Sequence, residues 1–108
     1  MAKIKKRIYG PALLPLTDTA MFTATSPTEI YSIWVSNPSG ASRTLRMSVG
    51  ADGATTRFLS DVTVAAGFQG TLAYPGIVLQ ATEILRGQVS VADVNVIVMG
   101  IIDQTTAT

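Results

Sequence analysis

Apolar and polar residues alternate with a period of two over several short runs, and turn-forming residues separate these runs. Successive side chains of a β-strand point to opposite faces, so this pattern predicts strands. The runs predicted as strands are residues 20–25, 29–37, 43–49, 57–66, 69–74, 77–81, 83–91 and 94–102. About eight strands at this spacing favour an all-β fold. We predict a single antiparallel β-sandwich, with jelly-roll and immunoglobulin-like topologies left open.

The only tryptophan, Trp34, lies in the run 29–37, which the turn sequence "NPSGAS" separates from the run 43–49. We interpret the two runs as a hairpin. On this interpretation Trp34 and Arg46 lie together on the face of the hairpin opposite the core, in a position that would suit a cation–π contact. Trp34 could also stack on a sugar, but tryptophan and arginine there favour a protein interface. The residues assigned to the core face are Tyr31, Ile33, Val35, Leu45, Met47 and Val49.

The last run, "VNVIVMGII", is apolar on both faces. A strand of a two-layer sandwich normally has one face in water. Either the N-terminal segment or another subunit should therefore cover the second face of this strand. We assign a subunit interface to Trp34, Arg46, Ile97, Met99 and Ile101.

Charge is distributed unevenly along the chain. Charged residues make up 14% of the chain, below the roughly 25% of an average domain, which favours oligomerisation. Four of the eight cations lie in the first seven residues, and the rest of the chain holds four arginines and seven acids. We expect an extended basic arm over residues 1–18, a sandwich over 19–103 and a tail over 104–108. The residues expected to bind a partner are Lys3, Ile4, Lys5, Lys6, Arg7, Ile8, Leu13 and Leu14.

The alternative for this arm is a disordered terminus that aids solubility. Nucleic-acid binding by a β-domain needs a basic face with exposed stacking aromatics. Because the body of the chain is net acidic, we do not expect nucleic acid as the partner. No apolar run approaches the ~20 residues of a membrane span, so no membrane partner is expected.

The chain has no cysteine and no histidine. Serine–histidine and cysteine–histidine catalysis, disulfides and cysteine metal sites are therefore excluded. Asp18, Glu29, Asp52 and Asp61 are interpreted as solvated residues in or near turns, because their spacing gives no sign of a paired-carboxylate site. No calcium-binding or phosphate-binding motif is present. We predict a non-enzyme with no catalytic residue, metal or cofactor.

Several segments together resemble small virion proteins of tailed bacteriophages. "YGPALLPLTDTAMFTATS" contains a Gly-Pro lead segment, and "TEIYSIWVSNPSGASRTLRMSVGAD" an Ile-x-x-Ile-x-Val-x-Asn strand. "GIVLQATEILRGQVS" and "VNVIVMGII" are similar to two later strands of that family. Ser26-Pro27 stands where Ala-Pro is usual, Thr82 where glycine is common and Glu83 where aspartate is common. The residues matching the strand motifs are Ile30, Ile33, Val35, Asn37, Thr44, Leu45, Ser48, Gly50, Leu79, Glu83 and Leu85.

This resemblance implies a β-sandwich that assembles as a homo-oligomer, with a trimer favoured, on the virion. It implies a capsid decoration (cement) protein that binds the major capsid protein or other virion proteins and stabilises the head. The alternative is a neck or tail accessory module that recognises another virion protein or a host surface glycan. The expected location is the virion, after synthesis in the cytoplasm of the bacterial host.

Overall fold

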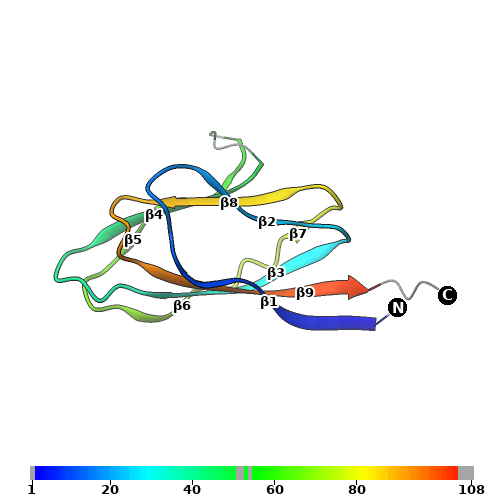
Figure 1. The fold of residues 1–108 in the computed structure, drawn as a ribbon, viewed down its shortest axis with the longest axis horizontal. Coiled ribbons are helices and arrows are strands. Elements are labelled where there is room, and N and C mark those ends of the chain that lie inside the picture. Colours follow the sequence, from blue (N-terminus) through cyan, green and yellow to red (C-terminus); the bar gives the residue numbers. More distant parts are fainter. Residues whose placement is uncertain (1, 51–52, 54, 105–108) are drawn as a thin grey trace.

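Two antiparallel β-sheets pack face to face in the computed structural model, which describes residues 2–50, 53 and 55–104 (Figure 1). The predicted all-β sandwich is confirmed. No helix in the described part of the chain is long and apolar enough to cross a membrane. The strands are β1 (Ala2–Leu13), β2 (Thr19–Thr23), β3 (Thr28–Ser36), β4 (Arg43–Val49), β5 (Arg57–Val64), β6 (Gln69–Ala73), β7 (Val78–Leu79), β8 (Ile84–Val89) and β9 (Asn95–Gln104).

The strand pairings are nested along the chain. One sheet has the order β1-β9-β3-β6, with the short β7 also paired to β3, and the other has the order β2-β8-β4-β5. The first strand therefore pairs with the last, the second with the next to last, and the middle strands β4 and β5 with each other. A long antiparallel ribbon folded over itself in this way is a jelly roll, one of the two topologies left open by the sequence.

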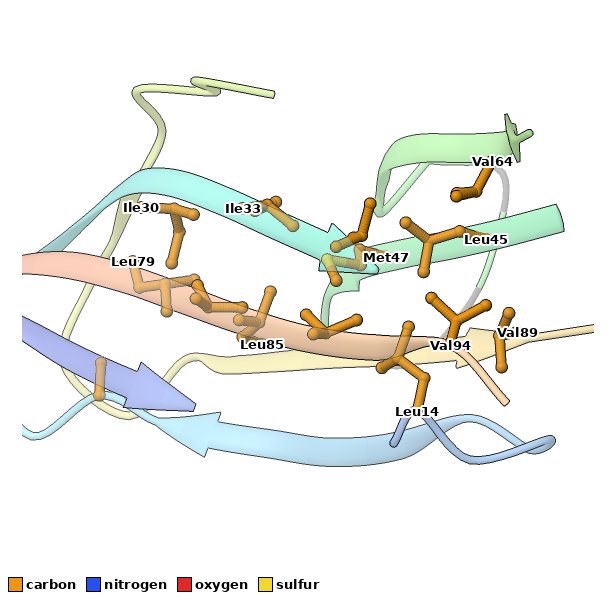
Figure 2. Packing of buried hydrophobic residues seen from close by; sticks show 14 residues of the cluster. Leu14, Ile30, Ile33, Leu45, Met47, Val64, Leu79, Leu85, Val89 and Val94 are labelled. Carbon is orange, nitrogen blue, oxygen red and sulfur yellow. The ribbon is translucent and has the colours of Figure 1, made fainter. Parts of the chain in front are cut away.

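The core lies between the two sheets and consists of aliphatic side chains (Figure 2). On β9 the inward residues are the valines, while Ile97, Met99 and Ile101 lie on the other side and are half-buried. The run predicted over residues 83–91 ends as a strand at Val89, and Val91 beyond it is exposed. The largest fully buried residues are Leu14, Ile30, Ile33, Leu45, Met47, Leu79, Leu85, Val35, Val64, Val94, Val96 and Val98.

The expected hairpin between β3 and β4 is wrong, because the two strands lie in different sheets. Buried Asn37 organises the crossing between them. Its Nδ2 lies 3.0–3.1 Å from the carbonyl oxygens of Ala41, Val64 and Ala65. Its Oδ1 accepts a hydrogen bond from the Ser39 hydroxyl at 2.7 Å. These bonds tie the loop after β3 to the end of β5, and so lead the chain into the second sheet.

Because of a bulge in β3, Tyr31 lies on the opposite side of the sheet from the one predicted. The register against β9 shifts between Ile30 and Ser32. Ile30 and Ile33 are both fully buried, while Tyr31 is exposed. A bulge inserts an extra residue and reverses the alternation beyond it. Tyr31 therefore lies on the outer side of the sheet with Trp34, and not in the core.

The N-terminal segment is a strand of the sandwich, which corrects the expected boundary between arm and body. β1 pairs with β9 from Ala2↔Gln104 to Leu13↔Asn95. Gly10 has a φ of +81°, and a Cβ there would collide with the backbone carbonyl oxygen of Val96. Glycine is thus required where β1 crosses close to β9. Gln104, assigned to the tail, is the last residue of β9, and residues 105–108 lie outside the described residues.

Candidate interaction surface

The side of the β1-β9-β3-β6 sheet that faces away from the other sheet carries a mixed apolar, aromatic and cationic surface. Ile97 pairs with Trp34, and Ile101 lies between Lys5 on β1 and Glu29 on β3. Directly paired residues share a face of a sheet, so these side chains are neighbours. We call this surface the β9 face; its residues are Lys3, Lys5, Arg7, Glu29, Tyr31, Trp34, Tyr74, Ile97, Met99 and Ile101.

Four of the five residues assigned to a subunit interface lie together on the β9 face: Trp34, Ile97, Met99 and Ile101. All four are half-buried. In Figure 1 the described strands of the other sheet lie on the opposite side of β9. The N-terminal segment, offered as a possible cover, instead pairs edge to edge with β9.

One lysine and two tyrosine rings lie in a row at one end of the β9 face. The Lys5 Nζ lies 4.4 Å from the centroid of the Tyr31 ring, a cation–π contact. The Tyr31 and Tyr74 rings meet edge to face, with centroids 6.0 Å apart. Tyr74 is 69% exposed. The β9 face therefore presents aromatic side chains to solvent beside a cation, which is the combination found at protein interfaces and ligand platforms.

The cations of β1 differ from the other arginines in their partners. Lys3, Lys5, Lys6 and Arg7 are all exposed. None of the four forms an ion pair with a described side chain. Their charge is therefore available to a partner.

The fifth interface residue, Arg46, is placed elsewhere, and its expected cation–π contact with Trp34 is wrong. Arg46 lies on β4 in the second sheet, with its Nη2 2.7 Å from Asp61 Oδ1 on β5. Arg46 does not lie beside Trp34 because the chain crosses to the other sheet after Asn37, which separates β3 from β4. Arg46 and Asp61 instead line an open hollow of about 300 Å3 with Leu16, Thr44, Gln88, Val89 and Ser90.

Two further arginines are held by carboxylates. Arg86 on β8 donates from Nε to Asp18 Oδ2 at 2.8 Å. Arg43 on β4 donates from Nε and Nη2 to the Asp93 carboxylate at 2.9 and 2.8 Å. The hydrogen bonds from Arg43 hold the pKa of Asp93 below its usual value, and its burial opposes the shift. Because Asp93 precedes β9 and Arg43 begins β4, this pair links the two sheets.

The apolar residues among those expected to bind a partner divide into two groups. Leu14 is fully buried in the core, and its N–H donates to the carbonyl oxygen of Val94 at 3.0 Å. Ile8 is half-buried and packs against the core. Leu14 is therefore unavailable to a partner, whereas Ile4 and Leu13 are 43% and 56% exposed.

The projecting end of β1 and β9 has a hollow on each side. On the β9 face, a hollow of about 80 Å3 is lined by Lys3, Pro27, Glu29, Val78 and Ile101. On the opposite side, a hollow of about 230 Å3 is lined by Ile4, Lys6, Thr25 and Ile102. The two hollows follow the alternation of β1, which sends Lys3 to one side and Ile4 to the other.

The described residues hold no group of three or more acidic side chains placed to bind a metal ion. Asp18 lies in the connection between β1 and β2, near a turn as expected, and it also forms an ion pair with Arg86. Asp61 lies within β5 and not in a turn, and it pairs with Arg46. Asp52 lies outside the described residues. Glu83 accepts a hydrogen bond from the backbone N–H of Gln80 at 2.6 Å.

Three members of the β9 face, Glu29, Tyr31 and Tyr74, are not among the site residues predicted from the sequence. Strict alternation assigns Tyr31 to the core, because it does not reveal the bulge in β3. Tyr74 follows β6 directly and precedes Pro75-Gly76, a turn signal that ended the predicted strand at this residue. The one sequence signal for Tyr74 as a surface residue is its place as an aromatic residue at a strand end, next to a turn.

Comparisons with protein-family models, curated protein sequences and solved structures found no match to this chain.

Proposed function

We propose that this chain is a non-enzymatic structural protein of a tailed-bacteriophage particle. Its role would be that of a capsid decoration protein, which oligomerises as a trimer and binds the major capsid protein to stabilise the head. The resemblance in the sequence supports the phage particle as its location. The β9 face carries the proposal of a binding role, because exposed cations there border an apolar and aromatic surface.

The residue types of the β9 face favour a protein partner. Aromatic residues, methionine and arginine are enriched in the cores of protein interfaces. Here Trp34 and Met99 would lie at the centre of the contact, with the β1 cations at its rim. Rim charges of this kind steer association and select partners more than they add affinity.

Many copies on a particle would convert weak contacts into firm attachment. Each subunit that touches two neighbouring capsid subunits links them, and further contacts then form at a high effective concentration. The sandwich suits this role because its two sheets are joined by a continuous aliphatic core. Such a rigid body transmits load between the proteins that it links.

The proposal is tested with the full chain, empty phage heads and sedimentation. The purified protein should have three times the mass of one chain, and it should sediment with heads that lack decoration. Trp34→Ala/Met99→Ala should abolish co-sedimentation, whereas Thr23→Ala/Thr63→Ala, at exposed positions of the other sheet, should not. A monomer that remains in the supernatant would contradict the proposal.

The exposed Tyr31–Tyr74 pair favours a second candidate, a neck or tail module that recognises a host surface glycan. Aromatic faces stack on sugar rings as well as on protein side chains. The discriminating variant is Tyr74→Ala, because Tyr74 is the most exposed aromatic of the pair. Loss of binding to host cells with an unchanged oligomeric state would support the glycan.

A further inference from the structure

β1 forms one edge of its sheet. It pairs with β9 on one side, and no described strand pairs with its other side. Residues 3–7 are all exposed. The free backbone N–H and C=O groups of an edge strand can accept another extended chain as an added strand. The edge of β1 is thus open to such a segment.

The charge on this edge argues against a second copy of β1 as the added strand. Two copies pairing antiparallel would bring their lysines and arginines close together, and like charges opposite each other destabilise a sheet. Among the described acidic residues, none lies on a strand that is free to pair with β1. Asp18, Asp61 and Asp93 are bound by arginines, and Glu83 is bonded to a backbone N–H. Glu29 and Asp103 lie on β3 and β9, which already belong to the same sheet as β1. We therefore take the acidic groups to come from a different protein.

The alternation of β1 specifies the side chains of that segment. Lys3, Lys5 and Arg7 lie on the β9 face, in register with Asp103, Ile101 and Met99. Ile4 and Ile8 lie on the opposite side, where the hollow beside Ile4 has a volume of about 230 Å3. Residues of an added strand would alternate in the same way. Acidic side chains would then meet the cations, and aliphatic side chains would enter the hollow.

We propose that the edge of β1 binds an extended segment of a partner protein in which acidic and aliphatic residues alternate, by adding it as a strand to the β1-β9-β3-β6 sheet. The proposal rests on the proposed function only in taking the partner to be a protein of the same particle. Lys6, on the aliphatic side, adds a cation whose stem can lie along the segment.

The test uses the full chain and a fluorescent eight-residue peptide that alternates glutamate and valine. Fluorescence anisotropy should show binding that weakens as salt is raised. A peptide that alternates lysine and valine should not bind. A Glu/Val peptide with N-methyl groups on alternate residues keeps its charge but loses the N–H groups along one edge. Its affinity should fall by about tenfold or more if the segment forms a strand.

A matched pair of variants locates the site. Lys5→Gln/Arg7→Gln should lower the affinity for the Glu/Val peptide by about three- to tenfold. Thr23→Glu/Thr63→Glu makes the same change in net charge at exposed positions of the other sheet and should leave the affinity within about twofold. Circular dichroism would show that both variants keep the β-fold.

Three outcomes would overturn the proposal. These are equal binding of the N-methylated peptide, equal loss of affinity in both variants, and tighter binding of a single-stranded oligonucleotide than of the Glu/Val peptide. Failure of the proposed function gives a different pattern. In that case the peptide binds to the β1 edge while the full chain does not sediment with phage heads.

Discussion

The outer face of the β2-β8-β4-β5 sheet carries arginines held by carboxylates of the same chain, whereas the β9 face carries cations that pair with no described carboxylate. Arg46 and Arg86 lie 2.7–2.8 Å from their carboxylate partners. Lys5 instead lies over the ring of Tyr31. The side chains between the cations also differ, because the β9 face has half-buried Ile97 and Met99 where the other face has Thr44 and Gln88.

This difference separates two uses of positive charge in one small domain. A guanidinium that is held by a carboxylate of its own chain contributes to the folded state and offers little to a partner. An exposed cation on an edge strand contributes little to folding, but it keeps like edges apart and attracts acidic ones. We therefore expect changes on the two faces to alter different measurements, which the following predictions address.

The largest effect is expected where β1 crosses close to the strand β9. Gly10→Ala should lower the free energy of unfolding by about 4 kcal/mol, because the new Cβ meets the Val96 carbonyl oxygen at a left-handed φ. Gly40→Ala is the control, since nothing lies within 4 Å of a Cβ there. Urea unfolding of both variants measures the difference. Equal stability of the two would mean that β1 is not anchored at Gly10.

A neighbouring pair of leucines separates core from surface within the same segment. Leu14→Ala should cost about 3 kcal/mol of unfolding free energy, because Leu14 is fully buried. Leu13→Ala should change it by less than about 1 kcal/mol, because Leu13 is 56% exposed. Thermal and urea unfolding provide the measurement. If Leu14→Ala left stability unchanged and abolished partner binding, Leu14 would belong to a binding arm after all.

The Arg43–Asp93 pair should make stability depend on pH at the acidic end. The folded chain holds the pKa of Asp93 below its usual value, chiefly through hydrogen bonds from Arg43. A lowered folded-state pKa adds stability above the unfolded value of about 3.9, and this stability is lost as pH falls through the folded pKa. Wild type should exceed Asp93→Asn in urea midpoint at pH 7. The gap should close below about pH 4, and a gap unchanged down to pH 2 would contradict this role of the pair.

The smallest effect on folding is expected on the β9 face. Lys5→Gln/Arg7→Gln should alter the free energy of unfolding by no more than about 0.5 kcal/mol, because both side chains are exposed on an edge strand. Arg43→Gln should lower it further, since it leaves the Asp93 carboxylate without its guanidinium partner. Parallel urea titrations test this ranking. If Lys5→Gln/Arg7→Gln lowered the free energy of unfolding more than Arg43→Gln did, the distinction between the two faces would be lost.

Much of the fold followed from the sequence. The runs predicted as strands coincide with β2 to β9 to within a few residues. Strand positions are local information, because the period of two, the turn residues and the β-branched side chains all act within a few residues. The apolar second face of β9, which required a cover or a partner, was visible for the same reason.

The candidate surface was only partly predictable. Ile97, Met99 and Ile101 could be grouped with Trp34 because they have the right phase on their strands. Arg46 could not be excluded, because its separation from Trp34 depends on Asn37 carrying the chain into the second sheet. Tyr31 was placed in the core because a bulge moves a side chain to the other face without changing the composition of the strand.

The period of two and the turn residues suffice to predict the class of fold and the strands, and the composition shows that histidine and cysteine are absent. The basic segment becomes the edge strand β1 only in the tertiary structure, where Lys5 lies over the ring of Tyr31. Its pairing with β9 joins residues at opposite ends of the chain, and no local pattern reports such a contact. The carboxylate partners of Arg43, Arg46 and Arg86 likewise depend on tertiary contacts. An exposed lysine and a salt-bridged arginine therefore look alike in a sequence.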